Sequence, residues 1–295
     1  MQTSTPHTRR PRGQRARIAA LAVGLAAAGI LGGQTVRLSD KRHAEEVWTS
    51  LSALGPAQPA EFEPGMVDDL PEPARRYFLH AIAPGTALWM AAEIDMVGWI
   101  GLGDRDNPRY MAMRTREILA PPHGFVWIAS IGSGLMSISG SDAYADGEAW
   151  TRFWLLGTVP VVRPAVTPDL IRSAAARSII EGALWVPTYL LPQNGVAWEP
   201  VDDHRARAVV EHRGERFAVE LTVAGDGELK SVVMQRWSNV NPEGADRWQP
   251  FGGTIEEVGT FDGCTVPVRV HAGNHFGTEA YFPFFRADVV NVRYR

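Results

Sequence analysis

A change of hydrophobic period near residue 86 limits most strongly what this chain can fold into. From there on, apolar and polar residues alternate in short runs, as in residues 92–96, where Ala, Ile and Met alternate with Glu and Asp. Alternation with a period of two is typical of half-buried β-strands. Turn sequences separate the runs, and the clearest hairpin turn is Asp262-Gly263. Short turns between neighbouring strands predict antiparallel pairing.

A single strong helix signal interrupts the strands. Thr167 is a suitable N-cap, Pro168 fits the first turn, and an apolar face continues to about Leu184. Two shorter helices are predicted over residues 39–54 and 70–82. We therefore expect a mainly β (α+β) fold. It would be a wide, curved antiparallel sheet or half-barrel of about a dozen strands, with the helix from Pro168 packed across one face and further helices near the N-terminus.

The N-terminal segment has the pattern of a membrane anchor or an export signal. Residues 1–17 contain five arginines and no acidic residue, and residues 18–33 carry no charge. A spanning helix needs about 20 apolar residues, and the apolar core of a cleaved signal peptide is shorter. Arginines before such a segment favour a cytoplasmic N-terminus. We expect a single-pass bacterial cell-membrane protein with an extracytoplasmic C-terminal domain, or a secreted protein if the segment is cleaved.

Composition and segment boundaries divide the chain into four parts. The net charge is −4 although the first part is strongly basic, so the body is acidic and a nucleic-acid partner is not expected. The four parts are a basic cytoplasmic tail (1–17), a signal-anchor or signal peptide (18–36), a helix with a proline-rich linker (37–68) and a single β-rich domain (69–295).

Motifs that carry catalysis are missing from the sequence. It contains no G-x-S-x-G, H-E-x-x-H, C-x-x-C or phosphate-binding glycine loop. The one cysteine, Cys264, has neither a neighbouring base nor a helix N-terminus beside it, and we interpret it as a small hydrophobic residue. We therefore favour a non-enzymatic protein without a cofactor or a metal ion.

Two histidines offer an alternative, a metal-dependent hydrolase. His271 and His275 are four residues apart, which on a straight strand separates them by roughly 13 Å. They could bind one metal ion only if the chain folds back at Gly273-Asn274, where Asp262 or Glu279 could join them. A polar strand end is the simpler interpretation.

Aromatic residues give the strongest indication of a binding site. The chain has ten tryptophans, and residues 281–285 read Tyr-Phe-Pro-Phe-Phe. Core packing explains most such residues, but a curved sheet over one helix also leaves room for an apolar pocket. Our leading hypothesis is a cell-envelope domain that binds a hydrophobic ligand such as a lipid or an acyl chain. A protein-interaction module is the further alternative. The candidate ligand-binding residues are Trp127, Trp154, Trp185, Leu190, Phe284 and Phe285.

Several motifs in order resemble a bacterial family known only as a domain of unknown function. They are Leu-Pro-Glu-Pro-Ala-Arg-Arg-Tyr-Phe at 70–78, Asp-Ala-Tyr-Ala-Asp-Gly at 142–147, Trp-Val-Pro-Thr-Tyr-Leu-Leu-Pro at 185–192 and Trp-Glu-Pro-Val-Asp-Asp at 198–203. The resemblance covers about residues 69–295 and implies a single domain with no assigned activity. More remotely, the expected layout is similar to the half-barrel of periplasmic lipoprotein carriers, which hold acyl chains between a curved sheet and helices.

Overall fold

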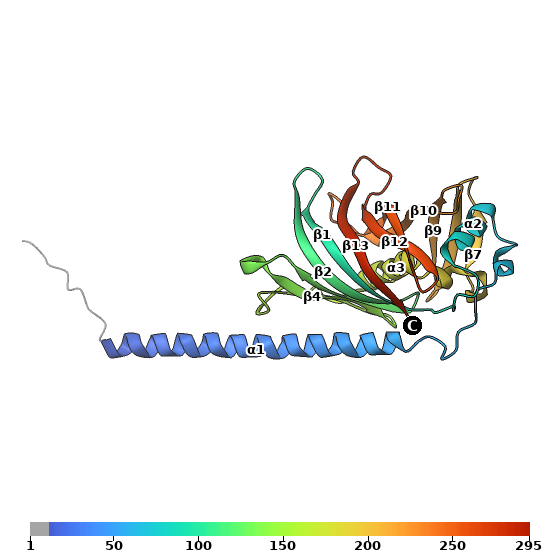
Figure 1. The fold of residues 1–295 in the computed structure, drawn as a ribbon. Coiled ribbons are helices and arrows are strands. Elements are labelled where there is room, and N and C mark those ends of the chain that lie inside the picture. Colours follow the sequence, from blue (N-terminus) through green and yellow to red (C-terminus); the bar gives the residue numbers. More distant parts are fainter. Residues whose placement is uncertain (1–11) are drawn as a thin grey trace, which may run out of the picture.

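One antiparallel sheet dominates the computed structural model, which describes the backbone of residues 12–295 and the side chains of residues 31–295 (Figure 1). Thirteen strands form the sheet within these residues, so the predicted wide, curved antiparallel sheet is confirmed. The strands are β1 (Ala92–Gly103), β2 (Pro108–Ala120), β3 (Gly124–Ile131), β4 (Ile138–Ala145), β5 (Glu148–Leu155), β6 (Val159–Val162), β7 (Ala197–Pro200), β8 (Arg205–His212), β9 (Glu215–Val223), β10 (Leu229–Ser238), β11 (Arg247–Phe261), β12 (Cys264–Asn274) and β13 (Phe282–Tyr294).

The sheet consists of two meanders joined in the middle. The strand order is β6-β5-β4-β3-β2-β1-β13-β12-β11-β10-β9-β8-β7, so the first and last strands are neighbours. Their register pairs Ala92 with Tyr294 and Ile100 with Phe285, and a bulge lies between Asp95 and Met96. Every other pairing joins strands that follow one another in the chain. The β1–β13 pairing is therefore the long-range contact that unites the two halves.

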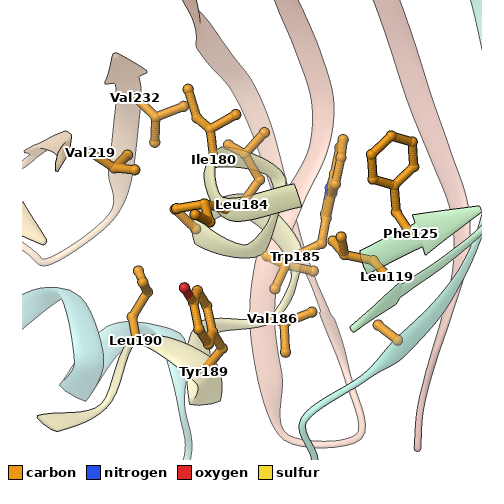
Figure 2. Packing of buried hydrophobic residues seen from close by; sticks show 14 of the residues in the cluster. Leu119, Phe125, Ile180, Leu184, Trp185, Val186, Tyr189, Leu190, Val219 and Val232 are labelled. Carbon is orange, nitrogen blue, oxygen red and sulfur yellow. The ribbon is translucent and has the colours of Figure 1, made fainter. Parts of the chain in front are cut away.

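Helix α3 (Pro168–Trp185) connects the two outermost strands, β6 and β7, by crossing the inner face of the sheet (Figure 1). The side chain of Thr167 accepts a hydrogen bond from the amide of Leu170, and Pro168 occupies the first turn, as predicted. The helix contacts strands of both halves. Figure 2 shows Leu184 on the side of Val219 and Val232.

The end of α3 reaches the other half of the sheet. Trp185 lies beside Leu119 of β2 and Phe125 of β3 (Figure 2), and its indole nitrogen donates to the carbonyl of Pro267 at 3.1 Å. Two short 3-10 helices, η3 (Pro187–Leu190) and η4 (Pro192–Asn194), then lead to β7. The helix is thus fixed against both meanders at its C-terminal end.

The sheet curls far enough for strands near its opposite edges to touch. The hydroxyl of Tyr144 in β4 and Nε2 of His212 in β8 are 2.7 Å apart, within hydrogen-bond distance. Their rings also meet edge to face, with centroids 6.0 Å apart. Since β4 and β8 lie near opposite edges in the strand order, this contact draws the sheet into a half-barrel around α3.

A long helix, α1 (Arg12–Ser52), covers the outer face of β2, β3 and β4 (Figure 1). It runs without a break through the segment predicted as an anchor (18–36) and the segment predicted as a separate helix from residue 39, because no proline occurs between residues 12 and 55 to end it. Ala44 and Leu51 are buried against the sheet. Within the part of the chain described here, we find no helix that combines the length and apolar character needed to cross a membrane. The side chains of the predicted basic tail, and those of the predicted anchor up to residue 30, are not among the described ones.

The segment between α1 and β1 packs on the domain. Phe62 and Val67, which fall in the predicted linker, are fully buried in the core, and Val67 ends a short 3-10 helix, η1 (Pro64–Val67). Helix α2 (Glu72–Ala81) begins after Pro71 and contributes Tyr77 and Phe78 to the same core. The structure therefore adds residues before position 69 to the packed core.

Alternation in the sequence predicts strands from residue 254, from residue 288 and over residues 150–162, and the structure differs from all three predictions. β13 begins at Phe282 and not near residue 288, because the run Phe-Pro-Phe-Phe lacks alternation and contains a proline. β11 begins at Arg247, before the predicted start at residue 254. A turn splits the predicted strand over 150–162 into β5 and β6.

The β1–β13 pairing gives a prediction about stability. Val292 of β13 pairs with Ile94 and is 2% exposed, whereas Val290, at the bulge, is 61% exposed. We expect Val292→Ala to lower the free energy of unfolding by about 2–3 kcal/mol, since it removes buried methyl groups and leaves a void. Val290→Ala should change it by less than about 0.5 kcal/mol. Urea denaturation measures both, and equal losses would contradict the assignment of this pairing to the core.

Candidate ligand-binding cavity

A cavity of about 420 Å³ lies between α3 and the inner face of the sheet. This volume is within the range of roughly 300–1,000 Å³ typical of small-molecule sites. The walls come from α3 and from strands of both meanders, and most of the lining side chains are aliphatic or aromatic. The apolar lining residues include Ile100, Leu102, Trp127, Ile131, Ile138, Phe153, Val161, Val162, Ile180, Leu184, Trp185, Val232, Phe251, Val270, Ala272, Phe284 and Phe285.

Four of the six candidate residues line this cavity: Trp127, Trp185, Phe284 and Phe285. Trp127 contacts Phe285 with ring centroids 6.4 Å apart, so residues distant in sequence form one aromatic wall. Their role in binding remains a proposal.

The other two candidates lie elsewhere. Thr151 and Phe153 of β5 line the cavity, so the adjacent Trp154 points to the opposite face. There its indole nitrogen donates to Asp40 of α1 at 3.2 Å. Leu190, in η3, is completely buried in the packed core. Neither residue lines the cavity.

Small residues on β11 keep part of the floor open. Gly252 and Gly253 both line the cavity beneath α3. A Cβ atom on Gly252 would lie 2.2 Å from the carbonyl oxygen of Val232, and one on Gly253 would lie 2.6 Å from that of His271. Neighbouring strands therefore approach too closely for any side chain here. At these two positions the cavity is therefore lined by the backbone of β11 alone.

The cavity opens to solvent along one edge. Leu102, Val161 and Val162 line it, yet they are 42%, 45% and 41% exposed. Leu135, between the lining residues Ile131 and Ile138, is 82% exposed. Exposed apolar residues at the edge of an apolar cavity provide a route by which a water-insoluble molecule can enter.

A buried ion cluster forms one polar part of the wall. Arg177 of α3 donates to Glu181 at 2.8 Å and to Asp142 at 2.5 Å, and lies 3.5 Å from Glu117. Its guanidinium also sits over the ring of Phe125, 4.3 Å from the centroid. Burial opposes its charge, but the three carboxyl groups outweigh burial and raise the pKa of Arg177 above its ordinary value.

Glu117 is the most deeply buried member of this cluster, with its side chain 1% exposed. Burial, followed by the negative charge of Glu181, raises the pKa of Glu117 well above its ordinary value, although Arg177 acts in the opposite direction. Burial therefore acts against the ionised form of Glu117. The closer carboxylate partners of Arg177 are Asp142 and Glu181.

A second arginine on the wall has a different environment. Nε of Arg236, in β10, donates to the carbonyl oxygen of Ser173 at 3.1 Å and to its hydroxyl at 3.2 Å. The guanidinium lies over Phe251, 4.7 Å from the ring centroid. Among the described side chains, no carboxylate lies within 4.0 Å of it. Burial, followed by the positive charge of Arg177, lowers the pKa of Arg236 to about 10, so it stays charged at neutral pH.

The side chains of the alternative metal site, His271, His275 and Asp262, do not come together. Asp262 lies in the turn before β12 and His275 follows its last residue, at the opposite end of the strand. His275 contacts the carbonyl of Val240 at 2.9 Å. Over residues 31–295, no three His, Cys, Asp or Glu side chains are grouped so that they could hold a metal ion. Burial raises the pKa of Cys264 to about 11, which opposes reactivity of its thiol.

The charged residues of the cavity were not predicted from the sequence, although the patterns contain a signal. Val232, Met234 and Arg236 occupy every second position of β10, and Val232 and Met234 are buried. Since alternate residues of a strand share one face, Arg236 is expected on the inner face as well. Arg177, Ile180, Glu181 and Leu184 follow the helical spacing of one face of α3. Each arginine, Arg236 on β10 and Arg177 on α3, lies on a face that is otherwise mainly apolar, and this contrast is the signal in the sequence.

Comparison with known proteins gives a family and two solved structures of low similarity. No curated protein matches the sequence. A LolA superfamily protein from Nitrosomonas europaea is similar in structure, with a TM-score of 0.39 and 11% identity over 76% of this chain and 92% of that one. A domain assigned to outer membrane lipoprotein sorting, from Vibrio parahaemolyticus, gives a TM-score of 0.30 and 11% identity over 70% and 86% of the two chains.

The sequence itself gives the family. Residues 60–287 match the family of unknown function DUF6544, and this match spans well over half of the 295 residues. It includes α2, α3 and almost the whole sheet, and it ends within β13. The chain therefore belongs to the DUF6544 family.

Proposed function

We propose that this domain binds a hydrophobic small molecule, such as a lipid or an acyl chain, in the cavity beneath α3. The observation that carries the proposal is the apolar lining of a cavity of about 420 Å³ that is open at one edge. Water gains few hydrogen bonds in such a space, whereas an apolar ligand gains dispersion contacts and leaves water. The cavity is large enough for a ligand and too large to be an ordinary packing defect.

Binding, and not catalysis, is the role that the charged groups favour. Arg177 is held by carboxyl groups, Glu117 is buried, and Cys264 is buried with a raised pKa. The hydroxyl of Thr151 donates to Asp142 at 2.7 Å on the cavity wall, but Asp142 is already the ion-pair partner of Arg177, so its charge is committed to that pair.

The position of α1 favours a membrane as the source of the ligand. Gln34 of α1 donates to the carbonyl of Gly157, in the turn that leads to Val161 and Val162 at the open edge of the cavity. Towards its N-terminus the helix continues into the uncharged sequence 18–33. We propose that this segment anchors or exports the domain at the cell envelope. The open edge would then lie on the side nearest the anchor.

Binding in the cavity can be tested with N-phenylnaphthylamine, a neutral apolar dye. We expect saturable binding by the full chain. Ile138→Trp, which places a large ring in the cavity wall, should weaken binding by at least about tenfold, equivalent to about 1.4 kcal/mol. Fluorescence titration measures this effect.

Val290→Trp is the matched control, since Val290 is exposed and is not among the cavity residues. Circular dichroism should show that both variants keep the wild-type sheet. Undiminished dye binding by folded Ile138→Trp would place the dye elsewhere and would contradict the proposal.

The envelope location gives a separate prediction. In intact spheroplasts of a bacterium that produces the full chain, added protease should degrade the β-rich domain, because the arginines hold the N-terminus on the cytoplasmic side. A cytoplasmic marker protein must survive the same treatment. Protection of the domain until the membrane is lysed would show the opposite orientation.

A further inference from the structure

We propose that the ligand is a single-chain amphiphile with an anionic head group, a carboxylate or a phosphate, and that Arg236 binds this head group. The inference rests on the proposed function and adds the chemical class of the ligand. It starts from the contrast between the two arginines that line the cavity.

Arg177 has no capacity left for an anion. Its nitrogens face Glu117, Asp142 and Glu181, all within 3.5 Å. A ligand anion would have to displace one of these carboxyl groups and leave it without its partner, which is costly in a buried site. Arg177 therefore stabilises the packing of α3 on β2 and β4.

Arg236 does have this capacity. Only its Nε makes hydrogen bonds to the described residues, and both of these go to Ser173. Its two terminal nitrogens have no hydrogen-bond partner, and no ion pair is formed, in the part of the chain described here. A charged guanidinium on the wall of an apolar cavity is costly unless an anion pairs with it. The vacant terminal nitrogens match the paired oxygens of a carboxylate or a phosphate.

The surroundings hold Arg236 in place for this role. The ring of Phe251 lies 4.7 Å from the guanidinium, and Ser173 fixes Nε from the first half of α3. A side chain held on both sides loses little freedom when it binds, which favours affinity. From this point Val232, Ile180 and Leu184 continue the wall, so an acyl chain attached to the head group would contact apolar side chains.

Nearby acids act against an anion and must be considered. Asp142 and Glu181 also line the cavity, and their charges favour the charged form of Arg236 at longer range. Both are paired with Arg177, and burial acts against the ionised form of Glu117. The local positive charge of Arg236 therefore decides the sign of the preferred head group. A cationic ligand is the outcome that would show the acids to dominate.

The test is displacement of N-phenylnaphthylamine from the full chain by four amphiphiles of equal length: dodecanoate, dodecyl phosphate, dodecanol and dodecylamine. We expect one or both anions to bind about tenfold to a hundredfold more tightly than dodecanol, the usual range for a hydrogen bond to a charged group. Tighter binding of dodecanoate would indicate a fatty acid, and tighter binding of dodecyl phosphate would indicate a lipid phosphate.

Arg236→Gln should abolish the preference for anions over dodecanol. Arg236→Lys, which keeps the charge without the paired donors, should retain part of the preference. Lys230→Gln, an exposed change on the same strand, is the matched control and should bind like the wild type. Urea denaturation verifies that each variant is folded.

The results separate this inference from the function on which it rests. Equal affinity for dodecanoate, dodecyl phosphate and dodecanol, tightest binding of dodecylamine, or an unchanged preference in folded Arg236→Gln would overturn the role of Arg236 while the cavity remained a binding site. If neither the dye nor any amphiphile bound saturably, the proposed function itself would fail.

Discussion

The pairing of β1 with β13 is the constraint on which the rest of this structure depends. All other strand pairs are local in sequence and can form as hairpins, but neither meander encloses a space by itself. When the first and last strands pair, the sheet becomes wide enough to curl, and Tyr144 can reach His212 across its opening. Only then can α3 pack against strands of both meanders. The cavity is thus a consequence of one long-range contact, which joins residues about two hundred positions apart.

Helix α3 has two opposing effects within that curled sheet. Its C-terminal end fills the interior, because Trp185 reaches β2 and β3 while Leu184 faces β9 and β10 (Figure 2). Earlier in the helix, the buried Arg177 pairs with Glu117 of β2 and Asp142 of β4. This cluster holds the helix on the first meander of the sheet. Gly252, Gly253 and Ala272 line the cavity with a small side chain or none, so they do not fill the space below the helix. The cavity therefore persists because the helix is held at both ends of it.

The sequence predicted well what depends on local patterns. The turns, the alternation and the cap at Thr167 predicted the antiparallel sheet and α3, and the aromatic residues indicated a pocket wall that includes Trp127 and Phe285. It predicted poorly what depends on distant partners. Trp154 faces outward because it alternates with Phe153, and no local pattern identifies its contact there with Asp40 of α1, 114 positions earlier in the chain. The early start of β13 was missed because its pairing with β1 and β12, not alternation, makes the aromatic run a strand.

The polar residues of the cavity show why apolar area alone does not define such a site. A wholly apolar cavity would accept any hydrophobic molecule of suitable size, since burial of apolar surface has no direction. Arg177 and Arg236 share the same wall, yet one is saturated by the protein and the other leaves its terminal donors vacant. The hydrogen bonds of Arg236 to Ser173 and its contact with Phe251 offset part of the cost of burying its charge, but its terminal nitrogens gain no partner from the described protein. Its presence is better explained by selection among ligands, because an unpaired charge in an apolar site favours a partner of opposite sign over all neutral competitors.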